Sequence, residues 1–271
     1  MNKIAFIGAG NMNRAIILGL MNQNVAPSSI IVSNPSAAKR EAIAEQTDIL
    51  HCQSNTEAAQ FADIIVLGVK PHLIADVCQE LAGSIDISNK CFISVAAGTT
   101  LEQIQSALGQ KLPVIRTMPN TPSQLGLGVS GLFASPEVSE QQRLQAEQLM
   151  KAVGIIKWLD KESDIDNIIA VSGSGPAYFF LFMEAMAEQA LALGFSEQEA
   201  RELVQQTALG AAQMVVENPE TSISQLRENV TSKGGTTQAA LNTFIQGGLP
   251  SLVSDAMQAA IDRAKAMAQQ A

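Results

Sequence analysis

The chain has 271 residues, a length that favours two folded cores over one. Hydrophobic residues make up 46% of it and charged residues 16%, a composition too apolar for a disordered protein. The 26 acidic and 17 basic side chains give a formal charge of −9, so attraction to nucleic acid or to anionic membranes is not expected. Composition therefore predicts a globular protein of two domains.

The three cysteines, Cys52, Cys78 and Cys91, are odd in number and lack the CxxC or Cys/His spacing of a metal site. We therefore expect no disulfide framework and no bound metal. The chain runs from Met1 to Lys3 directly into an apolar strand, without the pattern of a signal peptide, and no apolar run reaches 18 residues. These features predict a cytoplasmic protein without a membrane segment.

Short apolar runs alternate with helical patterns in the first part of the chain. Strands are predicted over residues 3–7, 30–33, 64–68, 91–95, 114–117, 127–133 and 155–159, and a helix over residues 139–152. The runs contain few polar residues, as expected of parallel strands that helices cover on both faces. Residues 1–161 are therefore predicted to form an α/β Rossmann-type domain with a mostly parallel sheet.

Strand patterns nearly stop after residue 163. Four helices rich in Ala, Leu, Met and Gln are predicted over residues 176–193, 196–216, 237–246 and 249–270. Residues 162–271 are therefore predicted to form an all-α domain. Such a small helical domain with so little charge is expected to hide apolar surface in a dimer.

A glycine turn follows the first predicted strand, with the sequence GAGNM at residues 8–12. Gly8 allows a tight turn, Gly10 lets the backbone approach a pyrophosphate, and the helix that follows offers unpaired N–H groups to the phosphates. The third position of the motif, usually Gly or Ala, is Asn13. A turn with no ligand is the alternative, but the order of strand, turn and helix favours dinucleotide binding.

The second strand ends in Ser33 and Asn34 and carries no acidic residue there. A carboxylate at this place usually binds the ribose diol of NAD, whereas hydroxyl, amide and cationic groups such as those of Lys39 and Arg40 suit a 2′-phosphate. We therefore expect NADPH, with NADH as a weaker alternative. An ordinary polar turn, with Ser36 capping the next helix, is the other interpretation of these residues.

Segments 68–71 and 95–98 follow two further strands, and ligands of open α/β sheets lie at such carboxyl ends. Lys70 is placed to reach a cofactor there, although a solvated lysine is nearly as well supported. His51 and His72 have no acid or nucleophile nearby in the sequence, so we expect them to be structural or surface residues.

Two polar glycine segments open predicted helices: VSGSGPAY at residues 171–178 and ENVTSKGGTT at residues 228–237. Both are suited to presenting backbone N–H groups, and helix capping by itself would explain either one. Together with RTMPNTP at residues 116–122 they are too specific for capping alone. With GAGNM, VKP at residues 69–71 and AAG at residues 96–98, the whole chain closely resembles pyrroline-5-carboxylate reductase. Two departures are Asn13, for a small residue, and Lys233, for proline.

The resemblance implies NAD(P)H-dependent reduction of the cyclic imine Δ1-pyrroline-5-carboxylate to L-proline, the last step of proline biosynthesis. The implied cofactor contacts are Gly8, Ala9, Gly10, Asn11, Met12, Ser33, Asn55, Gly68, Val69, Lys70, Pro71, Ala96 and Ala97. The implied substrate contacts are Ser174, Asn229, Gly234, Gly235, Thr236 and Thr237. The resemblance also implies a dimer of intertwined helical domains, which in this family often assembles into a decamer.

Hydride would pass from C4 of the nicotinamide to the imine carbon, so catalysis is expected to be mostly positioning. The substrate carboxylate needs an anchor, for which the N–H groups of Gly234, Gly235 and Thr236 are suited, and Lys233 adds positive charge. Thr237 is expected to orient the ring nitrogen and to pass a proton through water, since an isolated hydroxyl is a poor acid.

Two other functions share some of these features. Enzymes of the β-hydroxyacid dehydrogenase type use a lysine on the first long helix of the helical domain, and residues 176–188 contain none. A non-catalytic NADPH-binding regulator would not need the intact substrate segment at residues 234–237. Consumption of NADPH in the presence of pyrroline-5-carboxylate separates the three hypotheses.

Overall fold

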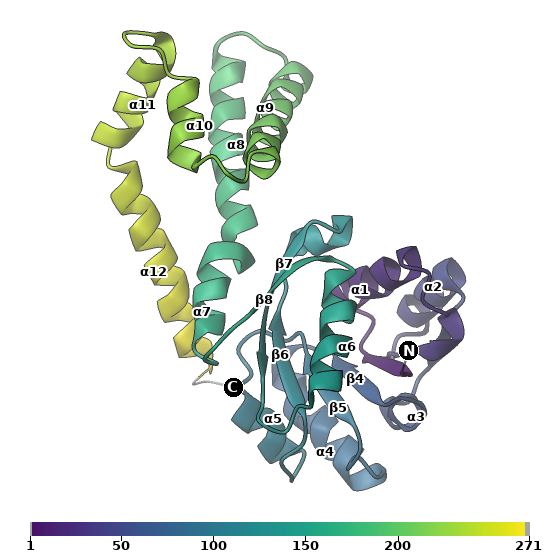
Figure 1. Cartoon of the computed structure of the whole chain (residues 1–271). Coiled ribbons are helices and arrows are strands. Elements are labelled where there is room, and N and C mark those ends of the chain that lie inside the picture. Colours follow the sequence, from purple (N-terminus) through teal and green to yellow (C-terminus); the bar gives the residue numbers. More distant parts are fainter. Residues whose placement is uncertain (1, 269–271) are drawn as a thin grey trace. The chain divides into compact units, whose positions relative to one another are not determined.

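The computed structural model describes residues 2–268, and Figure 1 gives the labels of its helices and strands. Packing divides the chain into two compact units. The first contains the residues up to Ser174 together with those from Ala260 onward, and the second is Gly175–Ala259. This division follows contacts, whereas the predicted domains 1–161 and 162–271 follow the sequence pattern and stay a prediction.

The first unit contains one eight-stranded sheet in the order β3-β2-β1-β4-β5-β6-β7-β8. Every neighbouring pair is parallel except β6 and β7, so the predicted Rossmann-type architecture is confirmed. The strands are β1 (Ile4–Ile7), β2 (Ile30–Ser33), β3 (Leu50–Cys52), β4 (Ile64–Leu67), β5 (Cys91–Ser94), β6 (Val114–Met118), β7 (Gly128–Ala134) and β8 (Gly154–Trp158).

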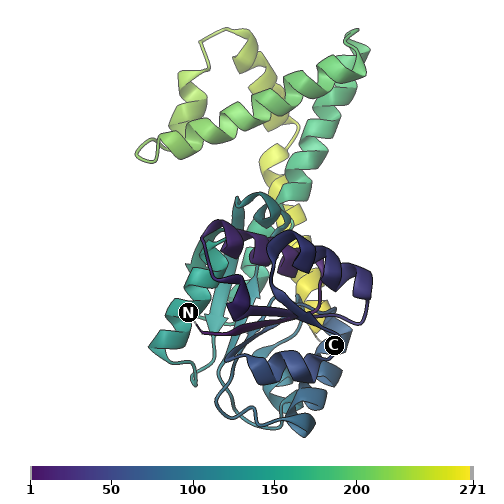
Figure 2. The same ribbon diagram turned by 90° about the vertical axis from the view of Figure 1, so that its right-hand side faces the viewer.

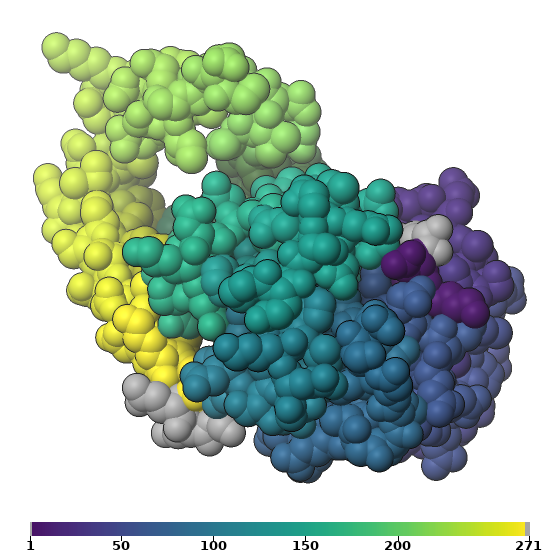
Figure 3. Space-filling view, turned by 60° about the horizontal axis from the view of Figure 1, so that its bottom comes forward, coloured from purple at the N-terminus to yellow at the C-terminus, as the bar shows by residue number. Residues whose placement is uncertain are grey.

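Helices cover both faces of this sheet, as Figure 2 shows, and all residues of the central strands β1, β4 and β5 are buried. Figure 3 shows one face of the molecule in space-filling form. Successive side chains of a strand point to opposite faces, so Ala5 and Ile7 join one apolar core while Ile4 and Phe6 join the other. The first core is covered by α3 (Asn55–Phe61), α4 (Ile74–Ser84) and α5 (Leu101–Ala107), and the second by α1 (Asn11–Asn22), α2 (Ala37–Thr47) and α6 (Glu140–Lys151).

One strand, β3, is absent from the sequence prediction. It is three residues long, lies at the edge of the sheet, and exposes Leu50 and His51. Its pairing with β2 sets His51 beside Val32, and no apolar run marks the segment. Pairing with a neighbour, rather than burial of its own side chains, defines this strand.

The first helix after β8 begins earlier than the helix predicted over residues 176–193. In the first unit α7 (Asp164–Ile168) leads into a π-helical turn, η4 (Ile169–Gly173). The second unit contains α8 (Gly175–Ala192), α9 (Glu197–Glu217), α10 (Ile223–Asn229), α11 (Thr236–Gln246) and the beginning of α12 (Leu249–Ala268). The prediction missed α7 and α10, and the last two residues predicted for α12 lie outside the described residues.

Large apolar side chains lie exposed on the helices of the second unit, among them Phe179 of α8, 71% exposed, and Leu252 of α12, 65% exposed. The helical stretch Asp164–Ala192 is long and apolar enough, by length and composition, to cross a membrane, and 17% of its most apolar window is buried. The exposed apolar side chains of these helices are therefore suited to contact with an apolar partner.

The cysteines lie inside the first unit, and all three are free thiols. Burial raises the pKa of the Cys78 thiol to about 12 and that of Cys91 to about 12, so both stay protonated at neutral pH. They act as small apolar side chains of the core.

Candidate functional site

The glycine turn between β1 and α1 depends on two features of Gly8. Its φ angle is +96°, which favours glycine, and a Cβ atom at this position would lie 2.8 Å from the carbonyl oxygen of Gly68. The N–H group of Gly8 donates to the carbonyl oxygen of Ser33 over 2.8 Å. The turn thus joins the carboxyl ends of β1, β2 and β4 at the edge of the sheet where dinucleotides bind.

The helix that follows this turn offers unpaired donors. Gly10 is the N-cap of α1 and has no side chain to cap it, so the first N–H groups of the helix lack intrahelical partners. The N–H group of Ala9 is already used, because it donates to Oδ1 of Asn34 over 3.2 Å. The start of α1 is therefore ready to bind an anion such as a pyrophosphate.

The structure separates the side chains at the end of β2 into buried and accessible ones. Ser33 is fully buried, and its hydroxyl donates to Oδ1 of Asn55 over 2.8 Å. The amide of Asn55 in turn donates to Glu80 over 3.2 Å. Ser33 therefore holds the side chain of Asn55 in place. The side chain of Asn34 is partly exposed and already bonds the backbone of Ala9 and Ser36, whereas the side chains of Ser36 and Lys39 are exposed.

Replacing Asn34 by aspartate is expected to lower the ratio of kcat/KM for NADPH over that for NADH by about 10-fold to 100-fold. The carboxylate keeps an acceptor for the Ala9 N–H group and loses only the 3.3 Å hydrogen bond to the Ser36 carbonyl, while its charge repels a 2′-phosphate. Steady-state kinetics with both cofactors measures the ratio. Asn22→Asp adds the same charge at the exposed far end of α1 and should leave it unchanged. An unchanged ratio in N34D would contradict the prediction.

The two other predicted cofactor segments lie at the ends of β4 and β5. The N–H group of Gly68 donates to the carbonyl oxygen of Ile7, and Lys70, the N-cap of η2 (Pro71–Leu73), has an exposed side chain. Ala96 is buried and donates its N–H group to the hydroxyl of Ser94 over 3.3 Å. His51 and His72, expected to be structural or surface residues, are exposed on β3 and η2.

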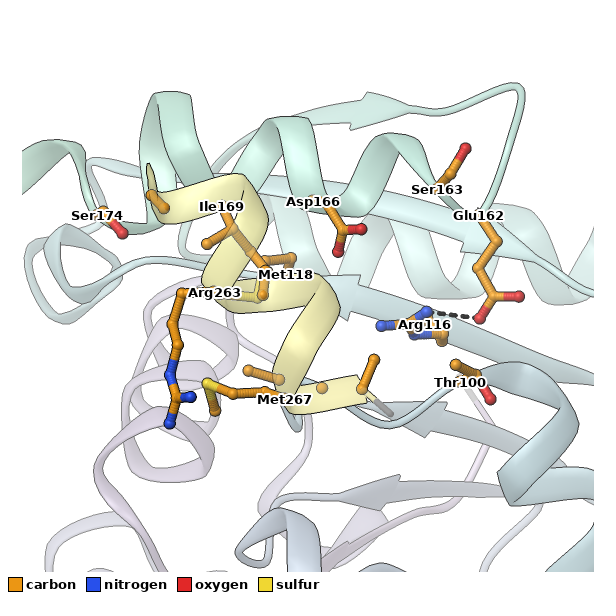
Figure 4. A pocket seen from close by; sticks show the side chains of 15 residues that line it. Thr100, Arg116, Met118, Glu162, Ser163, Asp166, Ile169, Ser174, Arg263 and Met267 are labelled. Atoms are coloured by element: carbon orange, nitrogen blue, oxygen red, sulfur yellow. Dashed lines mark hydrogen bonds and ion pairs between the residues drawn. The ribbon is translucent and has the colours of Figure 1, made fainter. Parts of the chain in front are cut away.

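A cavity of about 400 Å³ lies within the first unit (Figure 4). Ala97, a predicted cofactor contact, and Ser174, a predicted substrate contact, both line it. The last turns of α12 contribute Arg263 and Met267 to the wall. Residues that the sequence analysis assigned to two ligands therefore meet in one place.

An ion pair forms the polar wall of this cavity. Arg116 of β6 is 7% exposed, and its Nη1 lies 2.5 Å from Oε1 of Glu162. The same carboxylate oxygen accepts the N–H group of Leu101 over 2.7 Å at the start of α5. Arg116 thus connects its strand to the segment before α7, a role that the motif at residues 116–122 did not reveal.

Asp166 of α7 lines the same cavity, and burial raises the pKa of its carboxyl above the ordinary value of 3.8. The positive charges of Arg116 and Lys265 lower this pKa, and the negative charge of Glu162 raises it. Because burial dominates, the fold favours the neutral acid. The stability that the neutral carboxyl of Asp166 contributes is fully present below pH 3.8, its ordinary pKa. This stability is lost as the pH rises through the raised pKa of the folded protein.

Asp166→Asn is therefore expected to raise the melting temperature at pH 7, because it replaces a half-buried charge by a neutral side chain of the same shape. The gain should shrink as the pH falls through the raised pKa of Asp166 and should be absent below pH 3.8. Thermal unfolding between pH 3.5 and 7.5 measures it. Asp160→Asn removes an exposed carboxylate and serves as the control. A lower melting temperature for D166N at neutral pH would show that its attraction to Arg116 outweighs burial.

The segment at residues 171–174 is not the open glycine loop that we predicted. It belongs to the π-helical turn and its end, and the N–H group of Ser174 donates to the carbonyl of Ile169 over 2.8 Å. Pro176 has no N–H group to donate to the carbonyl four residues earlier, that of Ser172. Asn120 supplies the missing donor, over 2.9 Å, and its own Oδ1 accepts the N–H group of Val129. Helical hydrogen bonding therefore replaces the predicted free donors.

The segment at residues 228–237 also differs from the prediction. α10 ends at Asn229, whose Oδ1 accepts from Gln225 over 3.0 Å. The N–H group of Gly234, with a φ angle of +73°, donates to the side chain of Gln238 over 2.6 Å, and that of Gly235 donates to Ser232 over 3.0 Å. The N–H groups of Gly234 and Gly235, two of the three expected carboxylate anchors, are therefore engaged within the segment.

The start of α11 keeps its donors free. Gly235 is the N-cap and provides no side-chain cap, so the N–H groups of Thr236 and Thr237 lack intrahelical partners. Both side chains are exposed, and so is the ammonium group of Lys233. The anion-binding function that we predicted for Gly234 and Gly235 thus fits these two threonines better.

Comparison with known proteins relates both parts of the chain to described families. Residues 162–267 match the family described as pyrroline-5-carboxylate reductase dimerisation. Residues 3–98 match the family described as NADP oxidoreductase, coenzyme F420-dependent. The two matches cover the helical part and the first strands of the sheet, respectively.

Individual relatives extend along nearly the whole chain. A pyrroline-5-carboxylate reductase of Vibrio alginolyticus is 54% identical over 98% of this chain and 97% of its own length. A solved pyrroline-5-carboxylate reductase of Coxiella burnetii is 43% identical, with a TM-score of 0.93 and 98% of each chain covered. A Plasmodium falciparum pyrroline carboxylate reductase with NADP bound is 29% identical, with a TM-score of 0.86 over 98% of each chain.

Proposed function

Because this chain belongs to the pyrroline-5-carboxylate reductase family, we propose that it reduces Δ1-pyrroline-5-carboxylate to L-proline with NADPH as the preferred reductant. The observation that carries the proposal is the cavity of the first unit, which Ala97 and Ser174 line together. One of these residues was predicted to contact the cofactor and the other the substrate. A reductase of this kind needs such a meeting point for hydride transfer.

The residues around the glycine turn fit a dinucleotide. A side chain at Gly8 would collide with Gly68, and the uncapped start of α1 supplies donors for the pyrophosphate. Asn34 and Ser36 would hold the ribose phosphate, with Asn55 held beneath by Ser33. When bound, NADPH supplies a hydride from C4 of its nicotinamide ring.

The substrate is a small anion, and the start of α11 is the anchor that we propose for its carboxylate. The N–H groups of Thr236 and Thr237 and the charge of Lys233 all favour an anion there. The hydroxyl of Thr237 would hydrogen-bond the imine nitrogen, whose protonated form makes the neighbouring carbon electrophilic. Since a threonine hydroxyl is a weak acid, this residue orients the imine and water delivers the proton.

We further propose that the protein works in the cytoplasm as a dimer, which can assemble into a decamer. The exposed apolar residues of the second unit and of the stretch Asp164–Ala192 belong to the region that matches the dimerisation family. A second copy of the chain would cover these faces without any need for a lipid bilayer. The charge of −9 likewise does not favour an anionic membrane surface or nucleic acid.

The proposal is tested by following NADPH absorbance with purified protein and Δ1-pyrroline-5-carboxylate, and by identifying L-proline as the product. Oxidation of 3-hydroxy acids with NADP⁺ tests the dehydrogenase alternative, and NADPH binding without turnover would indicate a regulator. Proline formation that depends on both compounds is the expected result. Binding of NADPH with no consumption at any substrate concentration would overturn the proposed function.

A further inference from the structure

The third position of the glycine motif carries a large polar side chain inside the protein. Asn13 of α1 is 1% exposed, at the motif position where Gly or Ala usually allows close packing of helix and strand. A buried amide is unfavourable unless it forms hydrogen bonds, and in Asn13 the nitrogen forms them while Oδ1 has no partner within the described part of the chain. Its Nδ2 donates to the carbonyl oxygen of Gly8 over 2.7 Å and to that of Ile7 over 3.2 Å.

These contacts fix one peptide group of the turn from both sides. The carbonyl of Gly8 is held by Asn13, and the N–H group of the same peptide, which belongs to Ala9, is held by Asn34 over 3.2 Å. The C=O and N–H bonds of a trans peptide point in opposite directions. Asn13 and Asn34 together therefore prevent rotation of the peptide between Gly8 and Ala9.

Gly68 provides the space that Asn13 needs. A Cβ atom at Gly68 would lie 2.2 Å from Nδ2 of Asn13 and 2.3 Å from its Oδ1. The three nearest atoms to that Cβ all belong to Asn13, and the backbone of Gly68 does not adopt a positive φ angle. Position 68 therefore needs a glycine because the side chain of Asn13 occupies the space of a Cβ atom. The backbone conformation of residue 68 does not itself require glycine.

We propose that Asn13 is a positioning residue for the cofactor, which holds the carbonyl of Gly8 in the protein interior and keeps its negative end away from the pyrophosphate. A freed peptide at this place could turn that oxygen toward the phosphates and would weaken their binding. Gly68 is the partner that makes room for the amide. The inference rests on the proposed function in placing a dinucleotide at this turn.

Asn13→Ala is the variant that tests this role. Its dissociation constants for NADPH and NADH are expected to rise together, each by about 10-fold, because both cofactors share the pyrophosphate. Their ratio should stay within about twofold, unlike that of Asn34→Asp. The value of kcat at saturating NADPH should change little. Asn22→Ala, the same substitution at the exposed end of α1, is the matched control and should bind both cofactors normally.

Gly68→Ala tests the packing of the pair in the ligand-free protein. In the wild-type background the added methyl group collides with Asn13, so the melting temperature should fall and NADPH should bind more weakly. In the Asn13→Ala background the same methyl group fills vacated space, and it should cause no further loss in melting temperature. The melting temperatures of the four proteins form a double-mutant cycle that does not depend on activity.

Unchanged dissociation constants for both cofactors in N13A would overturn the proposed role. So would a loss confined to NADPH, or equal damage by G68A in both backgrounds. The proposed function fails separately: a wild-type protein that binds NADPH tightly but forms no proline would refute that function and leave the role of Asn13 intact. A wild-type protein that binds neither cofactor would overturn both.

Discussion

Thr237→Ala is expected to lower kcat for pyrroline-5-carboxylate reduction by about 10-fold to 100-fold, the loss of roughly 1.5–3 kcal/mol that accompanies one hydrogen bond to a charged group. The exposed hydroxyl of Thr237 lies at the second residue of α11, beside unpaired N–H groups that suit the substrate carboxylate. It is therefore placed to orient the imine nitrogen of an anchored substrate. Steady-state kinetics at saturating NADPH measures the effect.

Two further variants separate catalysis from helix stability. Thr237→Ser retains the hydroxyl and should recover most of the rate, whereas Thr237→Val retains the shape and should remain slow. NADPH affinity should change little in all three proteins, since the glycine turn belongs to the other unit. A normal kcat in a well-folded T237A protein would leave the backbone N–H groups as the only contribution of this segment.

Charged substitutions on the exposed apolar helices are expected to produce a monomer with activity lowered at least about 100-fold. Phe179→Lys and Leu252→Lys each replace a side chain that is more than half exposed in the isolated chain. In a two-fold symmetric dimer both substitutions occur twice, and each lost side chain contributes about 1.5–3 kcal/mol when buried. The sum corresponds to several orders of magnitude in the dimer dissociation constant.

Sedimentation velocity and turnover, measured on the same F179K/L252K sample, test this prediction. Gln198→Lys adds a positive charge to an exposed polar position of α9 and should remain dimeric and active. Normal circular dichroism of the variant at low temperature would show that its helices still form. A monomer with full activity would refute the requirement for a dimer.

For Asn13, the sequence identified the position, and the structure identified its contacts. The motif analysis identified it as a departure from a small residue, because a local pattern fixes which position faces the strand. Its hydrogen bond to Gly8 joins residues only five apart. Its fit against Gly68, in contrast, joins positions about 55 residues apart, which the parallel pairing of β1 and β4 brings together. No local pattern contains that contact.

Ser33 is a similar case. The end of β2 was recognisable from the sequence, since a buried parallel strand consists of apolar residues and a polar turn follows it. Sequence alone gave Ser33 and Asn55 the same role, as cofactor contacts. The structure buries the first completely and makes it a hydrogen-bond partner of the second, because residue 33 still belongs to the strand.

The sequence by itself determined the Rossmann-type sheet, the helical second part, the turn at Gly8 and the family, because periodicity and short motifs are local properties of the chain. Tertiary structure decided the edge strand β3, the helical state of residues 171–174 and the cavity that joins Ala97 to Ser174. These features depend on partners distant in sequence: β2 for β3, and Asn120 for the carbonyl that Pro176 leaves unpaired. A long-range hydrogen bond has no signature in the residues that form it until the fold brings them together.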